Sequence, residues 1–157
     1  MRILSGGQTG VDRAALDTAI EKGLPYGGWC PRGGWAEDLS EPPGLLAMYP
    51  NLKETPLSEP AQRTEWNVRD AGRLMILVDR AGIGASKGTE AAHDLALTRG
   101  KPCLVLDLDS GSALKQARAF LGEGKIKGDS SVCIAGPRES DAPGIYAKAR
   151  AFLRELL

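Results

Sequence analysis

The sequence predicts an α/β fold, a three-layer Rossmann-like sandwich built on a mainly parallel sheet. Five short apolar runs alternate along the chain with segments of helical periodicity, which is the pattern of βαβ units. Several runs are nearly continuous in Val, Ile and Leu, as expected for strands covered on both faces. Right-handed crossovers then place helices on both sides of the sheet. The length suits a single domain, assigned to residues 1–157.

The apolar runs themselves are the predicted strands, at 2–4, 26–30, 74–78, 103–108 and 131–136. A first helix is predicted from about Thr9 to Lys22, because Thr9 and Asp12 have the spacing of a capping box and Gly23 follows the last turn. Four further helices are predicted over 58–70, 89–100, 112–122 and 145–156. The last of them carries an apolar stripe that should face the core, at Ile145, Ala149, Phe152, Leu153 and Leu156.

One segment, residues 31–57, does not fit this alternation. It is rich in proline and has little periodicity, so we expect a long excursion over the sheet edge or over the site. Arg32 is a candidate ligand-binding residue within it. Core, lid and subunit-contact roles all remain open for Trp29 and Trp35, which flank Cys30 and Arg32.

Composition and charge exclude several classes of protein. The 20 basic residues balance the 20 acidic ones, so neither a nucleic-acid coat nor an anionic-membrane binder is expected. No apolar run approaches the ~20 residues of a membrane span, and no signal peptide is visible. The three scattered cysteines do not suggest a disulfide framework, which favours the cytoplasm. A single histidine excludes a His-rich metal site, and no carboxylate cluster has convincing ligand spacing.

The ends of the strands carry the unusual sequence. In an open parallel sheet the carboxyl ends of the strands meet at one edge, where ligands bind. The opening turn "SGGQTG" is a candidate anion cradle at a helix start, with hydroxyls and small residues at Ser5, Gly6, Gly7 and Thr9. Selectivity would come from Gln8, Asp12 and Arg13. The alternative is a tight strand-to-helix turn in which Thr9 only caps the helix.

A second loop, "GIGASKGTEAAH", repeats this design. It predicts phosphate contacts through backbone N–H groups, hydroxyls and an ammonium group, from Gly84, Ser86, Lys87, Gly88, Thr89 and Glu90. The alternative is a flexible loop before a well-capped helix.

Two further stretches could line the same crevice. Arg63, Trp66 and Asn67 share one helix face, where Trp66 could stack on a flat heterocycle and Arg63 could pair with a phosphate. A solvated face is the alternative. The stretch "AGPRES" places Arg138, Glu139 and Ser140 just past a strand, where they could serve the site or form an ordinary surface turn. Gly136, at the end of that strand, is a further candidate.

Taken in order along nearly the whole chain, five motifs resemble those of the molybdenum carrier proteins: "SGGQTGVDRAALD", "GGWCPRGGWAED", "RTEWNVRD", "KGTE" and "AGPRESDAPGIY". That family belongs to the permuted branch of the superfamily that includes the Lonely-Guy cytokinin-activating hydrolases and bacterial DNA-processing proteins. The resemblance implies a Rossmann-like subunit that forms a homo-oligomer, a dimer or a tetramer. It also implies a small phosphorylated ligand, a pterin phosphate or a nucleotide, with molybdenum cofactor (molybdopterin) as cargo.

Three functions remain open on the sequence. The favoured one is a carrier that binds its ligand and catalyses nothing. The second is a nucleotide N-glycosidic hydrolase, with Glu90, Asp12 or Glu139 as the acid/base and Arg13, Arg63 or Arg138 on the phosphate. The hydrolase relatives use a P-G-G-x-G-T-x-x-E motif; this chain lacks the P-G-G and has Ala92 at the glutamate position. The third is a sensor of a signalling nucleotide.

Overall fold

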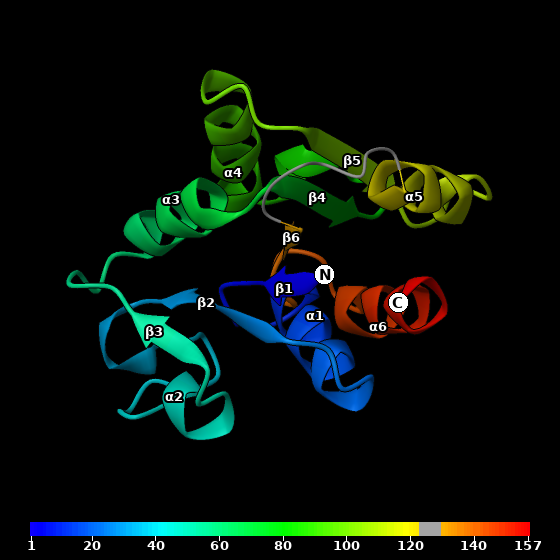
Figure 1. The fold of residues 1–157 in the computed structure, drawn as a ribbon. Coiled ribbons are helices and arrows are strands. Elements are labelled where there is room, and N and C mark those ends of the chain that lie inside the picture. Colours follow the sequence, from blue (N-terminus) through cyan, green and yellow to red (C-terminus); the bar gives the residue numbers. More distant parts are fainter. Residues whose placement is uncertain (123–129) are drawn as a thin grey trace.

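The computed structural model describes residues 1–122 and 130–157, and it confirms the predicted fold class. Six strands form one sheet in the order β3-β2-β1-β6-β4-β5, and all pairings between them are parallel (Figure 1). The strands are β1 (Arg2–Leu4), β2 (Tyr26–Cys30), β3 (Leu52–Glu54), β4 (Arg73–Val78), β5 (Cys103–Asp107) and β6 (Ser131–Ala135).

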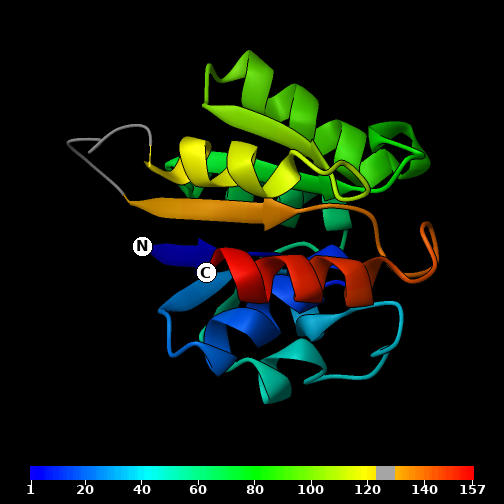
Figure 2. The ribbon, with the colours of Figure 1, turned by 90° about the vertical axis from the view of Figure 1, so that its right-hand side faces the viewer.

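Helices cover both faces of this sheet (Figures 1 and 2). One face carries α1 (Val11–Glu21), α5 (Ala113–Gly122) and α6 (Ile145–Leu156). The other carries α3 (Pro60–Asp70) and α4 (Lys87–Thr98). In the part of the chain that the structure describes, no helix is both long enough and apolar enough to cross a membrane.

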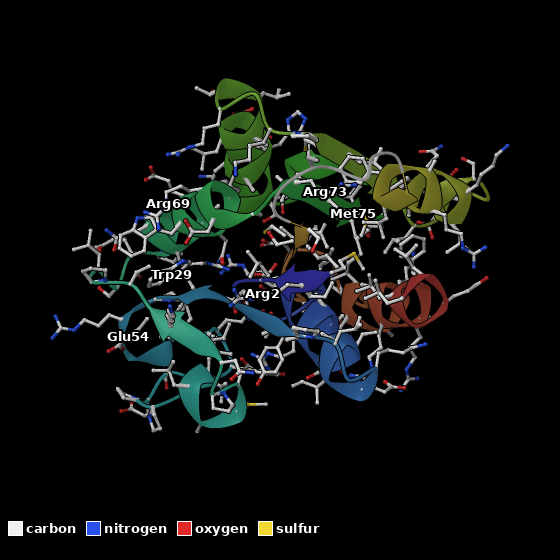
Figure 3. All side chains as sticks on the ribbon, viewed as in Figure 1. Arg2, Trp29, Glu54, Arg69, Arg73 and Met75 are labelled. Carbon is white, nitrogen blue, oxygen red and sulfur yellow. The ribbon has the colours of Figure 1, made fainter. Side chains whose placement is uncertain are left out.

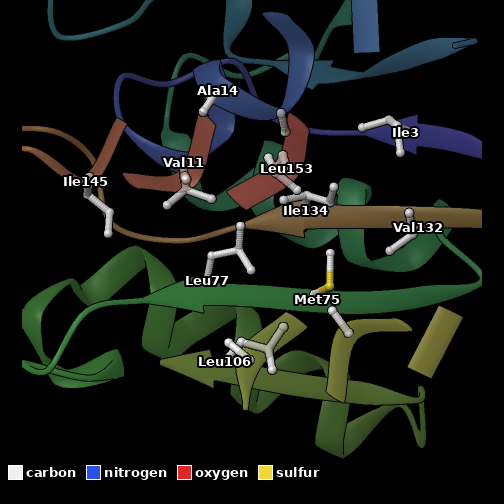
Figure 4. Packing of buried hydrophobic residues seen from close by; sticks show 14 of the residues in the cluster. Ile3, Val11, Ala14, Met75, Leu77, Leu106, Val132, Ile134, Ile145 and Leu153 are labelled. Atoms are coloured by element: carbon white, nitrogen blue, oxygen red, sulfur yellow. The ribbon is translucent and has the colours of Figure 1, made fainter. Parts of the chain in front are cut away.

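Strand β4 shows why the strands read as continuous apolar runs. Side chains alternate between the faces of a strand, so Met75 and Leu77 pack into the cluster beneath α1 and α6, while Leu74, Ile76 and Val78 pack beneath α3 and α4. All five are buried. Figure 4 shows Met75 and Leu77 of β4 close to Val132, Ile134, Leu153 and Ile145, side chains of β6 and α6.

The 31–57 excursion is more regular than the sequence suggests. It contains a 3-10 turn (Arg32–Gly34), the short helix α2 (Leu45–Met48) and β3, which pairs with β2 and forms one edge of the sheet. A three-residue strand in a proline-rich segment is too short to show a strand periodicity. The segment packs through a small core of its own with α1, around Leu16, Leu45 and Tyr49.

Two helices begin at other residues than predicted. Helix α1 begins at Val11, with Gly10 at the N-cap and no side-chain cap, so the predicted capping box of Thr9 and Asp12 does not form. The Thr9 hydroxyl donates instead to the carboxylate of Glu37, which comes from the distant excursion. Helix α4 begins at Lys87, two residues earlier than predicted. A long-range contact marks the α1 start, where the Val11 N–H donates to the Pro137 carbonyl, whereas the α4 start is set locally by Ser86.

The connections that follow the neighbouring strands β6 and β4 run to opposite faces of the sheet. The connection after β6 leads to α6 on one face, whereas the connection after β4 leads to α4 on the other. Adjacent strands whose connections leave to opposite faces open a crevice at their carboxyl ends. Gly136 lies at this point, directly against the Leu77 backbone and the Val11 side chain.

We expect Gly136→Ala to destabilise the protein, because the added Cβ would collide with the Leu77 carbonyl oxygen and lie 2.6 Å from Val11 Cγ2. The free energy of unfolding should fall by about 1–3 kcal/mol, the usual range for overpacking, as measured by urea denaturation. Gly111→Ala is the matched control, because a Cβ there meets nothing within 4 Å. Equal urea midpoints for Gly136→Ala and wild type would contradict the close packing.

Candidate functional site

A cavity of about 580 Å³ opens at the carboxyl edge of the sheet, beside the face change between β6 and β4. It is bounded by the β1–α1 loop, one side of α3, the loop and first turn of α4, and the segment after β6. Twelve of the residues predicted from the sequence line it: Gly6, Gln8, Asp12, Arg63, Asn67, Gly84, Ser86, Lys87, Gly88, Thr89, Gly136 and Arg138. The structure therefore brings three predicted motifs and the post-β6 turn to one cavity.

The first turn of α4 is the part of the cavity with unused hydrogen-bonding groups. The Thr89 side chain is only 2% exposed, and its hydroxyl has no hydrogen-bond partner within the described residues. Ser86 is the N-cap and lines the cavity, as do Lys87 and Gly88. The first N–H groups of a helix lack intrahelical acceptors and lie at the positive end of the helix dipole. This turn therefore suits an anionic ligand.

The charges of the cavity also favour an anion. Three cations line it, Arg63, Lys87 and Arg138, against two carboxylates, Asp12 and Asp141. Arg63 pairs with Asp12 at 2.7 Å, and Arg138 pairs with Asp141 at 3.1 Å. Lys87 makes no ion pair with any described residue. The surplus positive charge thus lies on the first turn of α4.

Asp12 and Arg63 form a largely buried ion pair on the cavity wall, between α1 and α3. Burial raises the pKa of the Asp12 carboxyl above its ordinary value, and Arg63 and the backbone of Gln8 and Gly6 oppose this effect only in part. Arg63 donates to Asp12 through Nη1, whereas its buried Nε has no hydrogen-bond partner in the described part of the chain. This nitrogen is therefore a buried donor with no acceptor among the described residues.

The rest of the opening turn has a structural role. The Ser5 hydroxyl donates to the Ile134 carbonyl at 2.8 Å, which ties β1 to β6. Arg13 donates to the Gly7 carbonyl and to both carboxylate oxygens of Asp38. Ser5, Gly7 and Arg13 do not line the cavity, and the bonds they make hold the turn in shape.

Thr9 and Glu139 belong to a set of contacts that joins three loops. Glu37, from the excursion, accepts hydrogen bonds from the Thr9 hydroxyl and from the backbone and side chain of Ser140. The Glu139 backbone N–H donates to Thr9, and the Glu139 carboxylate accepts from the N–H of Tyr146. We call these residues, Thr9, Glu37, Glu139 and Ser140, the loop clasp. The structure corrects the expectation for Thr9 and Glu139, which border a second hollow and not the main cavity.

The polar face predicted on α3 is divided between two environments. Trp66 packs edge-on against Trp29, with ring centroids 4.6 Å apart, and the Arg69 guanidinium covers its ring. Figure 3 shows Trp29 and Arg69 on the same side of the molecule, beside α3. Trp66 does not line the cavity, and its ring packs against Trp29 and Arg69; its stacking on a ligand stays a prediction. Asn67 lines the cavity, yet its side-chain amide is already paired with the backbone of Trp29. Its oxygen accepts from the Trp29 N–H, and its nitrogen donates to the Trp29 carbonyl.

Arg32 and Glu90 do not line the cavity either, and both are exposed. Of the three carboxylates considered as a catalytic acid or base, only Asp12 lies in the cavity, where it is bound to Arg63. Among residues 1–122 and 130–157 no group of three or more His, Cys, Asp or Glu side chains is placed to hold a metal ion.

Among the cavity residues that the sequence analysis did not predict as site residues are Trp35, Cys133 and Asp141. Trp35 is the aromatic side chain that the excursion contributes to the cavity, a role that its sequence context does not separate from a core role. Cys133 lies inside an apolar strand and reads as an ordinary core residue; burial strongly raises the pKa of its thiol. The position of Asp141 six residues past the end of β6 is the signal that could have found it.

The fold and cavity define a class of protein, a Rossmann-like domain with a cavity at the carboxyl edge of its sheet. The chain belongs to the circularly permuted YpsA SLOG family, whose family model matches residues 3–157. It is also similar to a crystal structure from Syntrophus aciditrophicus SB, named as a putative molybdenum carrier protein. The two are 38% identical with a TM-score of 0.84, over 99% of this chain and 94% of that one. A comparison with curated proteins finds no match.

The loop clasp should make stability depend on pH through Glu37. Burial raises the pKa of the Glu37 carboxyl, but hydrogen bonds from Ser140 and Thr9 outweigh burial and hold this pKa below its ordinary value. The ionised carboxylate therefore stabilises the fold above the ordinary pKa, and this contribution is lost as the pH falls through the lowered pKa.

We expect Glu37→Gln to reduce the free energy of unfolding at pH 7 by about 1.5–3 kcal/mol, the usual value of hydrogen bonds to a charged group. The difference from wild type should shrink as the pH is lowered from about 5 toward 2. Urea denaturation at several pH values measures it. Glu41→Gln, at an exposed residue of the same excursion, is the control; a pH-independent difference for Glu37→Gln would contradict the assignment.

Proposed function

We propose that this protein binds a small phosphorylated ligand, a pterin phosphate or a nucleotide, with the phosphate at the first turn of α4. The observation that carries this proposal is the Thr89 hydroxyl, which is buried in the cavity wall and has no partner within the described residues. Leaving such a group unpaired costs about 1–3 kcal/mol, and a phosphate oxygen would remove that cost. Backbone N–H groups of the same turn and the unpaired Lys87 would complete the phosphate site.

The remainder of the ligand would occupy the cavity between α3 and the post-β6 turn. Trp35 supplies an aromatic side chain at the cavity wall, suited to stack on a flat heterocycle. Arg63 offers its unpartnered Nε, and Gln8 offers its amide nitrogen, because the hydrogen bonds of the Gln8 side chain with described residues use its oxygen. An aromatic wall with a few convergent polar groups is typical of a small-molecule site.

We further propose molybdenum cofactor as the cargo, so that the protein acts as a carrier. The support is the similarity to the protein named as a putative molybdenum carrier, together with a cavity that combines a phosphate site with an aromatic wall. A carrier needs a binding site and no reacting group, and no contact in the described residues favours the hydrolase or the sensor. The homo-oligomer and the cytoplasmic location stay predictions.

Thr89→Val should weaken binding of a phosphorylated ligand, because it removes the hydroxyl and keeps the shape of the side chain. A hydrogen bond to a charged group contributes about 1.5–3 kcal/mol, so the dissociation constant should rise about 10- to 150-fold. Calorimetry with molybdopterin and with AMP and GMP measures the change. Thr98→Val, at an exposed residue of the same helix, should bind like wild type.

An unchanged affinity in Thr89→Val would contradict the phosphate site. The cargo itself is tested separately, by native mass spectrometry of small molecules that stay with the protein through purification. Molybdopterin at one equivalent per chain is the expected result. A purified protein that is empty and rejects added molybdopterin would contradict the carrier function.

A further inference from the structure

Two turns in this protein have the sequence of an anion cradle, and they differ in whether a charged group of the protein already occupies them. Each follows a strand, contains glycine, and leads into a helix that contributes to the cavity: the turn before α1 and the turn before α4. At the turn before α4, Thr89 is unpartnered and Lys87 makes no ion pair with a described residue. The turn before α1 already holds a negative charge, which the chain itself supplies.

That charge is the carboxylate of Asp12. It lies directly against the turn, since a Cβ built on Gly6 would be 2.8 Å from Asp12 Oδ2 and would collide with Arg63 Nη1. Arg63, which could bind a phosphate from this side, donates to Asp12 at 2.7 Å. Asp12 is 5% exposed, so water screens its charge little. The Asp12 carboxylate therefore occupies the position that a phosphate bound at the turn before α1 would need.

The two turns are far enough apart to hold opposite ends of one ligand. They follow β1 and β4, which are separated in the sheet only by β6. Two steps between neighbouring strands span about 10 Å. A ligand with its phosphate at α4 would reach Asp12 with its other end, where a second anionic group would meet a buried like charge.

We propose that Asp12 is a specificity-determining residue that fills the second anion cradle and limits the ligand to one anionic group. The proposal rests on the proposed function, because it takes the α4 turn as the phosphate site. It deepens that function by naming the ligand class, a phosphate monoester whose other end is uncharged. Removing the Asp12 carboxylate should uncover a second phosphate site, made of Arg63 and the glycine turn.

The test counts inorganic phosphate bound per chain, by calorimetry and ³¹P NMR, in wild type and in Asp12→Ala. We expect one equivalent for wild type and two for Asp12→Ala. In Asp12→Ala/Thr89→Val only the α4 site should weaken, about tenfold or more, and in Asp12→Ala/Arg63→Leu the second equivalent should disappear. Asp94→Ala removes an exposed carboxylate outside the cavity and should bind one equivalent, as wild type does.

The outcomes separate this proposal from the proposed function. Two equivalents in wild type, or an Asp12→Ala variant that binds no more phosphate than wild type does, would overturn the role of Asp12. No phosphate on wild type, but one on Asp12→Ala that resists Thr89→Val, would keep that role and overturn the α4 site. If Asp12→Ala fails to fold, Asp12→Ser keeps a polar partner for Arg63 and carries the same expectation.

Discussion

The ion pair between Asp12 and Arg63 is the interaction on which the arrangement of the site depends. It joins α1 on one face of the sheet to α3 on the other, across the carboxyl edge of the central strands. Both side chains are largely buried, so the loss of either would leave an uncompensated charge, at a cost of about 3–5 kcal/mol. The pair lies against the backbone of Gly6, which explains why this position holds no side chain.

Around this pair, two similar turns take different roles. The turn before α1 has its hydrogen bonds made within the protein. Ser5 donates to β6, Arg13 donates to the backbone of the turn, and Asp12 accepts from backbone N–H groups of the turn. At the turn before α4, Thr89 in the cavity wall has no partner among the described residues. A turn whose polar groups are all hydrogen-bonded within the protein fixes the shape of a site. A turn with unpaired polar groups can gain hydrogen bonds when a ligand binds, which contributes to the binding free energy.

The excursion completes the site from outside the central sheet. Its edge strand β3 fastens it to β2, and Glu37 fastens it to the turns after β1 and β6. Trp35 lies in the chain between the end of β2 and Glu37, and it is thereby held at the cavity wall. A long connection that is pinned at both ends can place a side chain as reliably as a helix does, because its own contacts fix the backbone.

The sequence by itself determined the fold class, five of the six strands and the position of the crevice, since apolar periodicity and glycine-rich strand ends are local signals. It also predicted most of the residues that line the cavity, among them Gly6 and Arg138. Only the tertiary structure decided which predicted groups remain free. Thr9 and Arg13 are bound by Glu37 and Asp38, 28 and 25 residues away, and Trp66 packs on Trp29. Hydrogen bonds between distant segments leave no pattern in a single sequence, and they separate a binding group from a structural one.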